Sequence, residues 1–212
     1  MTHSLETEPR SGRNDLAAQW STVAAPFHHE LQARLHCAVV SVLHYRFSGS
    51  EDFRIGNWSD GAFETAPVVI DGDVTLQQTQ TTFESVEFFA PDGDSGASCT
   101  IALWPGSGEL AEVIGNCSAS LDAVIQIDEA NKTLIIHFRN DKHDRSTVEI
   151  WLSVYQSLAQ QFADQQKLDQ PIGQLDLLTP QLRETVLQFG ICLLYTSPSP
   201  RDQRGSRMPS SA

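Results

Sequence analysis

Histidines are the residues of this chain with the widest chemical repertoire, and two of the seven stand side by side as His28-His29. An imidazole changes its charge near neutral pH, so it can accept a proton in a reaction when its neighbours hold it in place. His28-His29 is the only histidine pair in the chain.

A second motif is the segment Gly93-Asp94-Ser95-Gly96, which has the form of the nucleophile segment of trypsin-like proteases, while His36-Cys37 has the form of their histidine segment. The residue that follows is Ala97 instead of Gly. His36 also falls inside a predicted helix, and its separation from Ser95 is too short for two β-barrel halves. We therefore interpret residues 93–96 as a loop.

The remaining histidines fall in ordinary structural contexts. His44 and His137 lie within periodic apolar segments and are predicted to be structural, and His143 is predicted to lie in a solvated, charged turn. No His, Asp or Glu cluster has the spacing of metal ligands, and no glycine-rich phosphate loop is visible. We expect no cofactor in this chain.

The cysteines and the overall composition narrow the class of protein. The four cysteines are far apart and form no CxxC pair, which favours buried thiols over a disulfide framework or a zinc site: Cys37, Cys99, Cys117 and Cys192. The net charge of −13 disfavours nucleic acid and anionic membranes as partners. No apolar run could span a bilayer and the N-terminal segment lacks the apolar part of a secretory signal, so we expect a cytoplasmic location.

The first half of the chain predicts two helices and two strands. Apolar residues recur at helical spacing from Glu30 to Phe47, and the stop signal Ser48-Gly49-Ser50 follows. Residues 53–58 alternate as a strand does, and residues 67–70 form a second apolar run. Thr75 and Gln78 have the spacing of a capping box, which predicts a helix to about Phe89.

The second half predicts three strands and a helix. The strands are expected at 99–104, 119–127 and 133–139, with the last two joined as a hairpin. Asp122 and Gln126 predict a wet side for the strand 119–127, so the more apolar strand that follows is expected to be more central. Ser146 and Glu149 predict a second capping box before a helix that runs to Phe162. The order predicts an α/β two-layer sandwich.

Three segments of the chain, in order, resemble one family. Residues 29–58 resemble the long helix, tight turn and strand of nonribosomal peptide synthetase condensation domains, and residues 134–162 resemble their closing strand, Asp-containing loop and helix. Residues 171–180, PIGQLDLLTP, are similar to the linker that joins a condensation domain to an adenylation domain. The resemblance implies one lobe, the second, of the two-lobed fold typified by chloramphenicol acetyltransferase.

The resemblance also implies what is missing. The family's centre is an HHxxxDG motif in the first lobe, whose second His acts as the base. After His28-His29 the motif positions hold Ala33 and Arg34 instead of Asp and Gly, and no DFGWG-like motif is visible. We therefore expect no catalytic residue in this chain.

The resemblance and the composition divide the chain into four parts. Residues 1–26 are predicted to be a flexible polar lead-in, 27–170 the lobe, and 171–190 the linker towards an adenylation domain. The Ser- and Pro-rich basic tail, 191–212, is similar to translated sequencing adapter, and we expect it to be artefactual or disordered and to make almost no contact with the lobe.

The expected function is a piece of a nonribosomal peptide synthetase-like or aminoadipate-reductase-like protein of secondary metabolism: a non-catalytic lobe that docks an adenylation domain and, in some arrangements, a carrier domain. The alternative is a fragment of a complete condensation enzyme that forms amide bonds between carrier-bound groups. ATP and a phosphopantetheine carrier would serve the parent protein. Apolar side chains expected at the docking surface are those of Ile172, Leu175, Leu177 and Leu178 in the linker and Phe53, Ile55 and Trp58 on the first strand. The alternative is that these side chains fold back onto the lobe.

Overall fold

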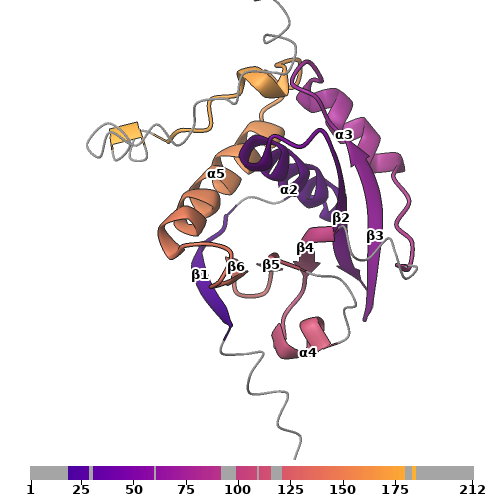
Figure 1. Ribbon diagram of the computed structural model, residues 1–212. Coiled ribbons are helices and arrows are strands. Elements are labelled where there is room, and N and C mark those ends of the chain that lie inside the picture. Colours follow the sequence, from indigo (N-terminus) through magenta and orange to yellow (C-terminus); the bar gives the residue numbers. More distant parts are fainter. Residues whose placement is uncertain are drawn as a thin grey trace, which may run out of the picture.

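The centre of the molecule is a mixed six-stranded sheet with the strand order β1-β6-β5-β4-β2-β3 (Figure 1). The computed structural model describes residues 19–28, 31–59, 61–91, 99–108, 110–115, 121–179 and 183–184. The strands are β1 Trp20–Pro26, β2 Asp52–Ser59, β3 Ala62–Val69, β4 Cys99–Pro105, β5 Ala123–Asp128 and β6 Thr133–Arg139. β4 runs parallel to both β2 and β5, and the other neighbouring pairs are antiparallel.

Two long helices cover one face of this sheet, a third helix packs beside one of them, and a short helix lies on the other face (Figure 1). The long helices are α2 Ala33–Ser48 and α5 Arg145–Ala163, the helix beside α2 is α3 Leu76–Ser85, and the short helix is α4 Leu110–Gly115. The α/β sandwich predicted from the sequence is confirmed. So is the packing of α2 and α5 on the same sheet, because both contribute to one buried apolar cluster.

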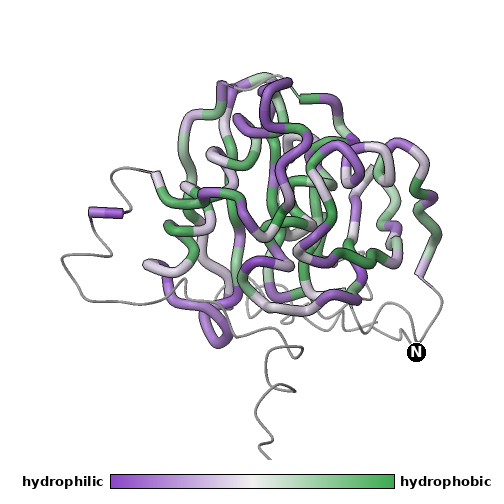
Figure 2. Tube along the Cα trace, turned by 90° about the horizontal axis from the view of Figure 1, so that it is seen from above, coloured by the Kyte–Doolittle hydropathy of each residue, from purple (hydrophilic) through white to green (hydrophobic). Residues whose placement is uncertain are grey.

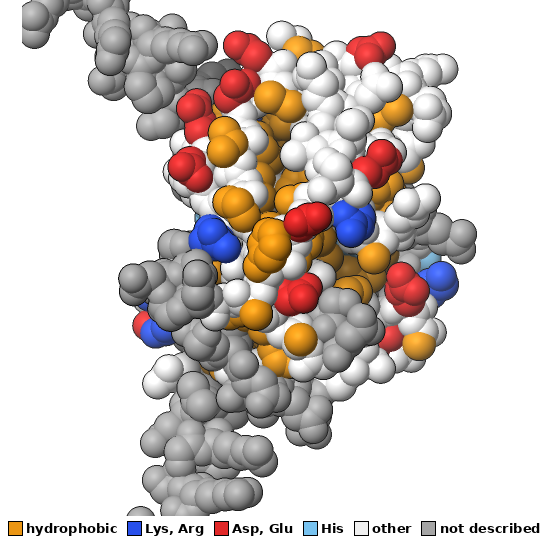
Figure 3. Space-filling model, turned by 90° about the vertical axis from the view of Figure 1, so that its right-hand side faces the viewer, with side chains coloured by type: hydrophobic (Ala, Val, Ile, Leu, Met, Phe, Trp, Pro, Cys, Tyr) orange, Lys and Arg blue, Asp and Glu red, His pale blue; other side chains and the backbone are white. Residues whose placement is uncertain are grey.

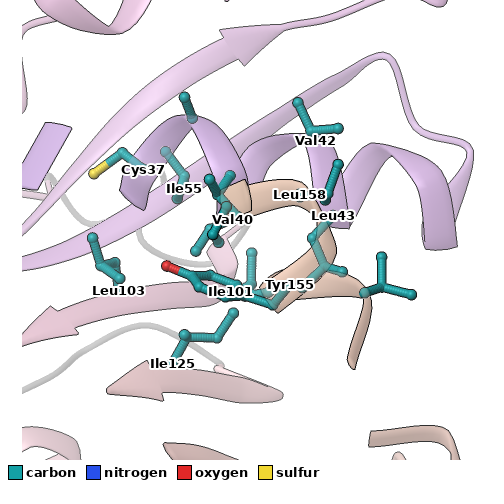
Figure 4. Packing of buried hydrophobic residues seen from close by; sticks show 14 of the residues in the cluster. Cys37, Val40, Val42, Leu43, Ile55, Ile101, Leu103, Ile125, Tyr155 and Leu158 are labelled. Atoms are coloured by element: carbon teal, nitrogen blue, oxygen red, sulfur yellow. The ribbon is translucent and has the colours of Figure 1, made fainter. Parts of the chain in front are cut away.

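The main core lies between α2, α5 and the sheet. Leu43 of α2, Ile125 of β5 and Tyr155 of α5 are buried in it, and the close-up shows the Tyr155 ring between the helices and the strands (Figure 4). In the view from above, hydrophobic and hydrophilic stretches alternate along the chain (Figure 2). A smaller cluster on the opposite face includes Trp104 and Val113.

The sequence predicts the start of α3 and the end of α2 correctly. Thr75 and Gln78 form the predicted capping box, with Gln78 N donating to Thr75 Oγ1 at 3.2 Å and Thr75 N donating to Gln78 Oε1 at 2.9 Å. Gly49 ends α2 with φ +69°, a left-handed conformation that glycine adopts without strain, and its N–H donates to the carbonyl oxygen of Tyr45. α3 ends at Ser85, four residues before the predicted end.

The capping box predicted at Ser146 and Glu149 is wrong. The helix begins two residues earlier than predicted: Asp144 is the N-cap in place of Ser146, Arg145 is the first helical residue, and no side chain caps the helix. Ser146 therefore lies inside the first turn, where its own backbone is helical. Glu149 instead accepts a hydrogen bond from Arg145 Nε at 2.9 Å.

The solvent-facing side predicted for the strand 119–127 is also wrong. Every residue of β5 is buried, because β5 is a central strand and both of its faces are covered. Gln126 faces the second cluster and is satisfied there: its Oε1 accepts from His137 Nε2 at 2.8 Å, and its Nε2 donates to the carbonyl oxygen of Gly106. β6, expected to be more central, lies one strand from the sheet edge.

The lead-in predicted for residues 1–26 includes a strand of the lobe. Trp20–Pro26 forms β1, which pairs antiparallel with β6 along its whole length. Its Thr and Ala residues do not form a clear apolar pattern, as is common for an edge strand with one solvent-facing side. Residues 1–18 lie outside the described part of the chain.

Candidate functional site

The docking residues predicted in the linker lie in a segment that we call the closing segment, residues 171–179. It contains a 3-10 turn, Ile172–Gln174. Ile172, Leu175 and Leu177 are at most 3% exposed and belong to the main core, whereas Leu178 is half-buried. The first three side chains therefore do not form an exposed docking surface. They pack into the main core instead.

Backbone hydrogen bonds attach the closing segment to the loop before α3. Ile172 N donates to the carbonyl oxygen of Val74 at 2.8 Å, and Gly173 N donates to that of Gly72 at 2.9 Å. The two glycines approach so closely that a Cβ atom on Gly173 would lie 3.0 Å from the Gly72 oxygen. A side chain at position 173 would therefore push the segment away from the lobe.

Two side chains strengthen this attachment. Arg46 of α2 donates from Nη1 to the carbonyl oxygens of Ile172 at 2.8 Å and Gly173 at 3.0 Å. Gln161 of α5 donates from Nε2 to the carbonyl oxygen of Asp176 at 3.1 Å. Because α2 and α5 both hold the segment, its path over the lobe is fixed as far as it is described.

The outward side of the closing segment is mostly polar. Gln174 and Asp176 are exposed between the buried leucines. The Asp176 carboxylate accepts from the backbone N–H of Leu178 at 3.2 Å and from Arg183 Nη2 at 2.7 Å. We call Gln174, Asp176, Leu178 and Arg183 the outer face of the closing segment.

The apolar surface predicted on the first strand is not exposed either. Phe53 and Ile55 of β2 are buried, and Trp58 is half-buried against the ring of Phe63. In the described part of the chain, Val69 and Phe89 are the large hydrophobic residues that remain exposed. On the face that carries β3 and α3, hydrophobic side chains are interspersed with polar and acidic ones (Figure 3).

The histidine pair lies in the connection between β1 and α2. His28 is exposed there, and His29 lies outside the described residues. Arg34, at the motif position where the family has Gly, donates from Nη1 to the carbonyl oxygens of Phe83, Glu84 and Val86 at 2.9 to 3.3 Å. The Arg34 guanidinium satisfies backbone carbonyl oxygens at the C-terminal end of α3 that have no partner within the helix. Arg34 therefore links α2 to α3.

His36 and Cys37 are core residues of α2. His36 Nδ1 lies 2.7 Å from the Tyr155 hydroxyl in a buried hydrogen bond. Burial lowers the pKa of His36 to about 4 and raises the pKa of the Cys37 thiol to about 12, so both groups are neutral at pH 7. A protonated buried thiol is a poor nucleophile. The segment 93–96 that would complete a protease-like site lies outside the described residues.

His137 is structural, as predicted. Its Nε2 donates to Gln126 Oε1, which leaves Nδ1 as the acceptor for the Thr22 hydroxyl at 3.2 Å. Burial lowers the pKa of His137 to about 4, and the neutral ring ties β1, β6 and β5 together.

His143 does not lie in a solvated turn. It is half-buried, with its ring 4.6 Å from that of Trp151, and burial lowers its pKa. His44 packs against Phe53 with 4.5 Å between ring centroids. Both imidazoles line a pocket at one end of the sheet that sequence reasoning missed. Its residues come from separate segments of the chain, so no spacing pattern could identify it.

Among the described residues, no group of three or more His, Cys, Asp or Glu side chains could hold a metal ion. Within the same part of the chain, no helix has the length and apolarity required to cross a membrane.

No protein-family model matches the chain, and no curated protein sequence matches it. Solved structures do match, over 76% of the chain in each of three examples. The starter condensation domain of rhizomide synthetase RzmA aligns with a TM-score of 0.52 at 13% identity. The X-domain in complex with OxyB from teicoplanin biosynthesis aligns with 0.55 at 13% identity.

A multidomain protein aligns as well. Holo-AB3403, a four-domain nonribosomal peptide synthetase bound to AMP and glycine, matches with a TM-score of 0.57 at 11% identity. The chain spans 48% of the RzmA domain, 48% of the X-domain chain and 18% of the AB3403 chain. These similarities show a condensation-type α/β fold, and the matched part of the chain spans about half the length of the condensation-type structures.

Proposed function

We propose that this chain is a non-catalytic condensation-type lobe of a nonribosomal peptide synthetase-like or aminoadipate-reductase-like protein, and that it docks an adenylation domain. The observation that supports this most directly is the closing segment. Its apolar side chains hold it on the lobe, while Gln174, Asp176 and Arg183 of its outer face are exposed and Leu178 is half-buried at the edge of the main core. The match to part of AB3403, a four-domain nonribosomal peptide synthetase, supports this proposal.

The attachment of the closing segment gives the proposal a physical basis. A partner domain tethered by a fixed segment samples fewer orientations than one on a flexible linker, so its effective concentration at a nearby surface is higher. Arg46 and Gln161 hold the backbone of the segment from two helices. In this proposal the lobe provides the fixed end of the tether, and the adenylation domain contacts the outer face.

The cofactors belong to other domains in this proposal. ATP would be used by the adenylation domain and phosphopantetheine would be carried by a carrier domain. In this proposal the lobe holds the adenylation domain in place and supplies no cofactor. The X-domain matched above was solved in complex with another protein, OxyB, which supports a binding role for a lobe of this fold.

A complete condensation enzyme remains the second candidate, favoured by one observation. The chain spans 48% of the RzmA condensation domain, as one of two lobes would. An in-frame segment upstream in the gene that encodes an HHxxxDG lobe would establish this function in place of the first.

Hydrogen exchange of the 212-residue chain, with and without the adenylation domain from the same gene, tests the docking proposal. We expect slower exchange in the closing segment and in residues 183–184 when the domain is added. Slower exchange confined to another surface, such as the exposed β3 edge at Val69, would place the contact elsewhere and contradict the proposed outer face.

A further inference from the structure

A pocket of about 250 Å³ opens between the C-terminal half of α2, the first residues of β4 and β5, and the beginning of α5. It is distinct from the closing segment, none of whose residues lines it. Its size suits a ligand smaller than a drug-sized molecule. Its walls combine apolar, aromatic and polar side chains: Leu43, His44, Phe47, Ser48, Thr100, Ile101, Asp122, Ala123, His143 and Trp151.

Asp122 supplies the carboxylate of this pocket. Its backbone is fixed by two hydrogen bonds, from its N–H to the carbonyl oxygen of Thr100 at 2.7 Å and from Arg139 N to its own carbonyl oxygen at 3.0 Å. Its side chain is half-buried and makes no hydrogen bond or ion pair within the described part of the chain. The nearby cation, Arg139, forms its ion pair with Asp141 at 2.6 Å and interacts with Asp122 only as a second negative charge near it.

The rest of the wall suits a hydrocarbon that ends in a positive charge. The rings of Phe47 and Trp151 lie 5.6 Å apart, and an aromatic face attracts a cation as well as packing against methylene groups. His44 and His143 are half-buried, and desolvation disfavours their charged forms. As neutral rings they can accept hydrogen bonds and do not repel a cation.

The same features disfavour an anion, a metal ion and a purely apolar ligand. An anion would be repelled by the Asp122 carboxylate, and among the described residues no Lys or Arg lines the pocket to offset that repulsion. A metal ion would need three or more ligands, and the described residues contain no such group. A purely apolar ligand would leave Asp122 desolvated without a partner, which costs free energy.

We propose that this pocket binds a primary ammonium group on a short hydrocarbon chain, with the ammonium at Asp122 and the chain against Phe47 and Trp151. The ligand is either a free aliphatic amine or the lysine side chain of another protein, because both present the same chemistry. The inference does not depend on the docking of an adenylation domain, since the two surfaces share no residue.

Two-dimensional NMR of the full chain, titrated with n-butylammonium chloride, tests the proposal. We expect saturable shifts at the Trp151 indole and at His44 and His143. Butyrate and butan-1-ol at the same ionic strength are the ligand controls, and both are expected to bind at least about tenfold more weakly because a charge pair with Asp122 is missing. Binding of butyrate or butanol as tight as that of butylammonium would overturn the proposal.

Two variants separate the pocket from the overall negative charge of the chain. Asp122→Asn keeps the shape of the side chain and is expected to weaken butylammonium binding at least about tenfold, with the thermal midpoint checked to confirm folding. Asp169→Asn removes an equal charge at an exposed position outside the pocket and is expected to leave binding unchanged. An equal loss in both variants, or no loss in Asp122→Asn, would overturn the proposal.

A second titration distinguishes the two sources of the ligand. Nα-acetyl-lysine N-methylamide presents the same ammonium on a peptide backbone. Tighter binding of this compound than of butylammonium identifies a lysine of a protein partner, and weaker binding identifies a free amine. Absence of binding by both compounds would contradict the assignment of the pocket altogether.

Discussion

The Nδ1 atom of His36 on α2 lies 2.7 Å from the hydroxyl oxygen of Tyr155 on α5, and both residues are buried in the main core. This hydrogen bond joins the two long helices of the lobe at a point that water does not reach. A pattern that resembles a protease histidine segment is thus part of the interior of the lobe.

Removal of one member of this pair should destabilise the lobe. In Tyr155→Phe the His36 nitrogen loses its partner in the core, so we expect a loss of about 1–3 kcal/mol in the free energy of unfolding. Urea denaturation of Tyr155→Phe, His36→Leu and the double variant measures this. The double variant should lose less than the sum of the single losses. Additive losses would show that the hydrogen bond contributes little.

The stability of the lobe should fall as the pH is lowered from about 6.5 towards 4. Burial holds the pKa of His36 and of His137 at about 4, below the value of 6.5 for an exposed histidine. The unfolded chain therefore binds more protons in this window, and each residue costs up to about 3 kcal/mol of stability as the pH falls through it. The contribution is fully present above pH 6.5.

Urea denaturation at several pH values between 7.5 and 4.5 measures this effect. The variant His36→Leu should show a shallower dependence on pH than the wild-type chain, because one of the two buried imidazoles is gone. An unchanged slope would show that acidic side chains, and not His36, dominate the pH dependence.

Sequence patterns were reliable where a local interaction decides the structure. The Thr75–Gln78 capping box, the glycine stop at Gly49 and the hairpin between β5 and β6 each depend on neighbours within a few residues. The fold class followed from them and from apolar periodicity. β1 was missed because an edge strand needs little apolar sequence of its own once β6 supplies its hydrogen bonds.

Patterns were misleading where a distant partner decides burial. The sequence pattern predicts that Gln126 faces solvent. In the structure its side-chain amide is buried in the second cluster, where it forms hydrogen bonds with His137 and Gly106. The sequence predicts that the linker leucines form an exposed apolar surface. In the structure Arg46 and Gln161 attach the closing segment to the lobe. The pocket at Asp122 could not be predicted, because four separate elements supply its walls.

The closing segment should detach when position 173 acquires a side chain. A Cβ atom there would lie 3.0 Å from the backbone oxygen of Gly72, so Gly173→Val should lower the free energy of unfolding by about 1–3 kcal/mol. It should also expose residues 171–179 to limited proteolysis. Gln174→Val, at an exposed position of the same turn, is the matched control and should stay resistant. Equal cleavage of both variants would contradict the close packing of the two glycines.

Neighbouring leucines of the closing segment should differ sharply in their contribution to stability. Leu177 is buried, so Leu177→Asp places a charge in the core and should cost at least about 3 kcal/mol. Leu178 is half-buried at the edge of the main core, and Leu178→Asp should cost less than Leu177→Asp, about 1–2 kcal/mol. Thermal denaturation of the two variants measures the difference. Similar midpoints would mean that the segment is not anchored as described.

The proposed docking role is tested most directly by calorimetric titration of the full chain with the adenylation domain from the same gene. We predict saturable binding that Leu178→Asp weakens at least about tenfold, since a charge would enter an apolar contact on the outer face. Val69→Asp, which alters an exposed apolar side chain on β3, should bind as the wild-type chain does. Absence of binding by the wild-type chain, or equal binding by all three proteins, would contradict the account.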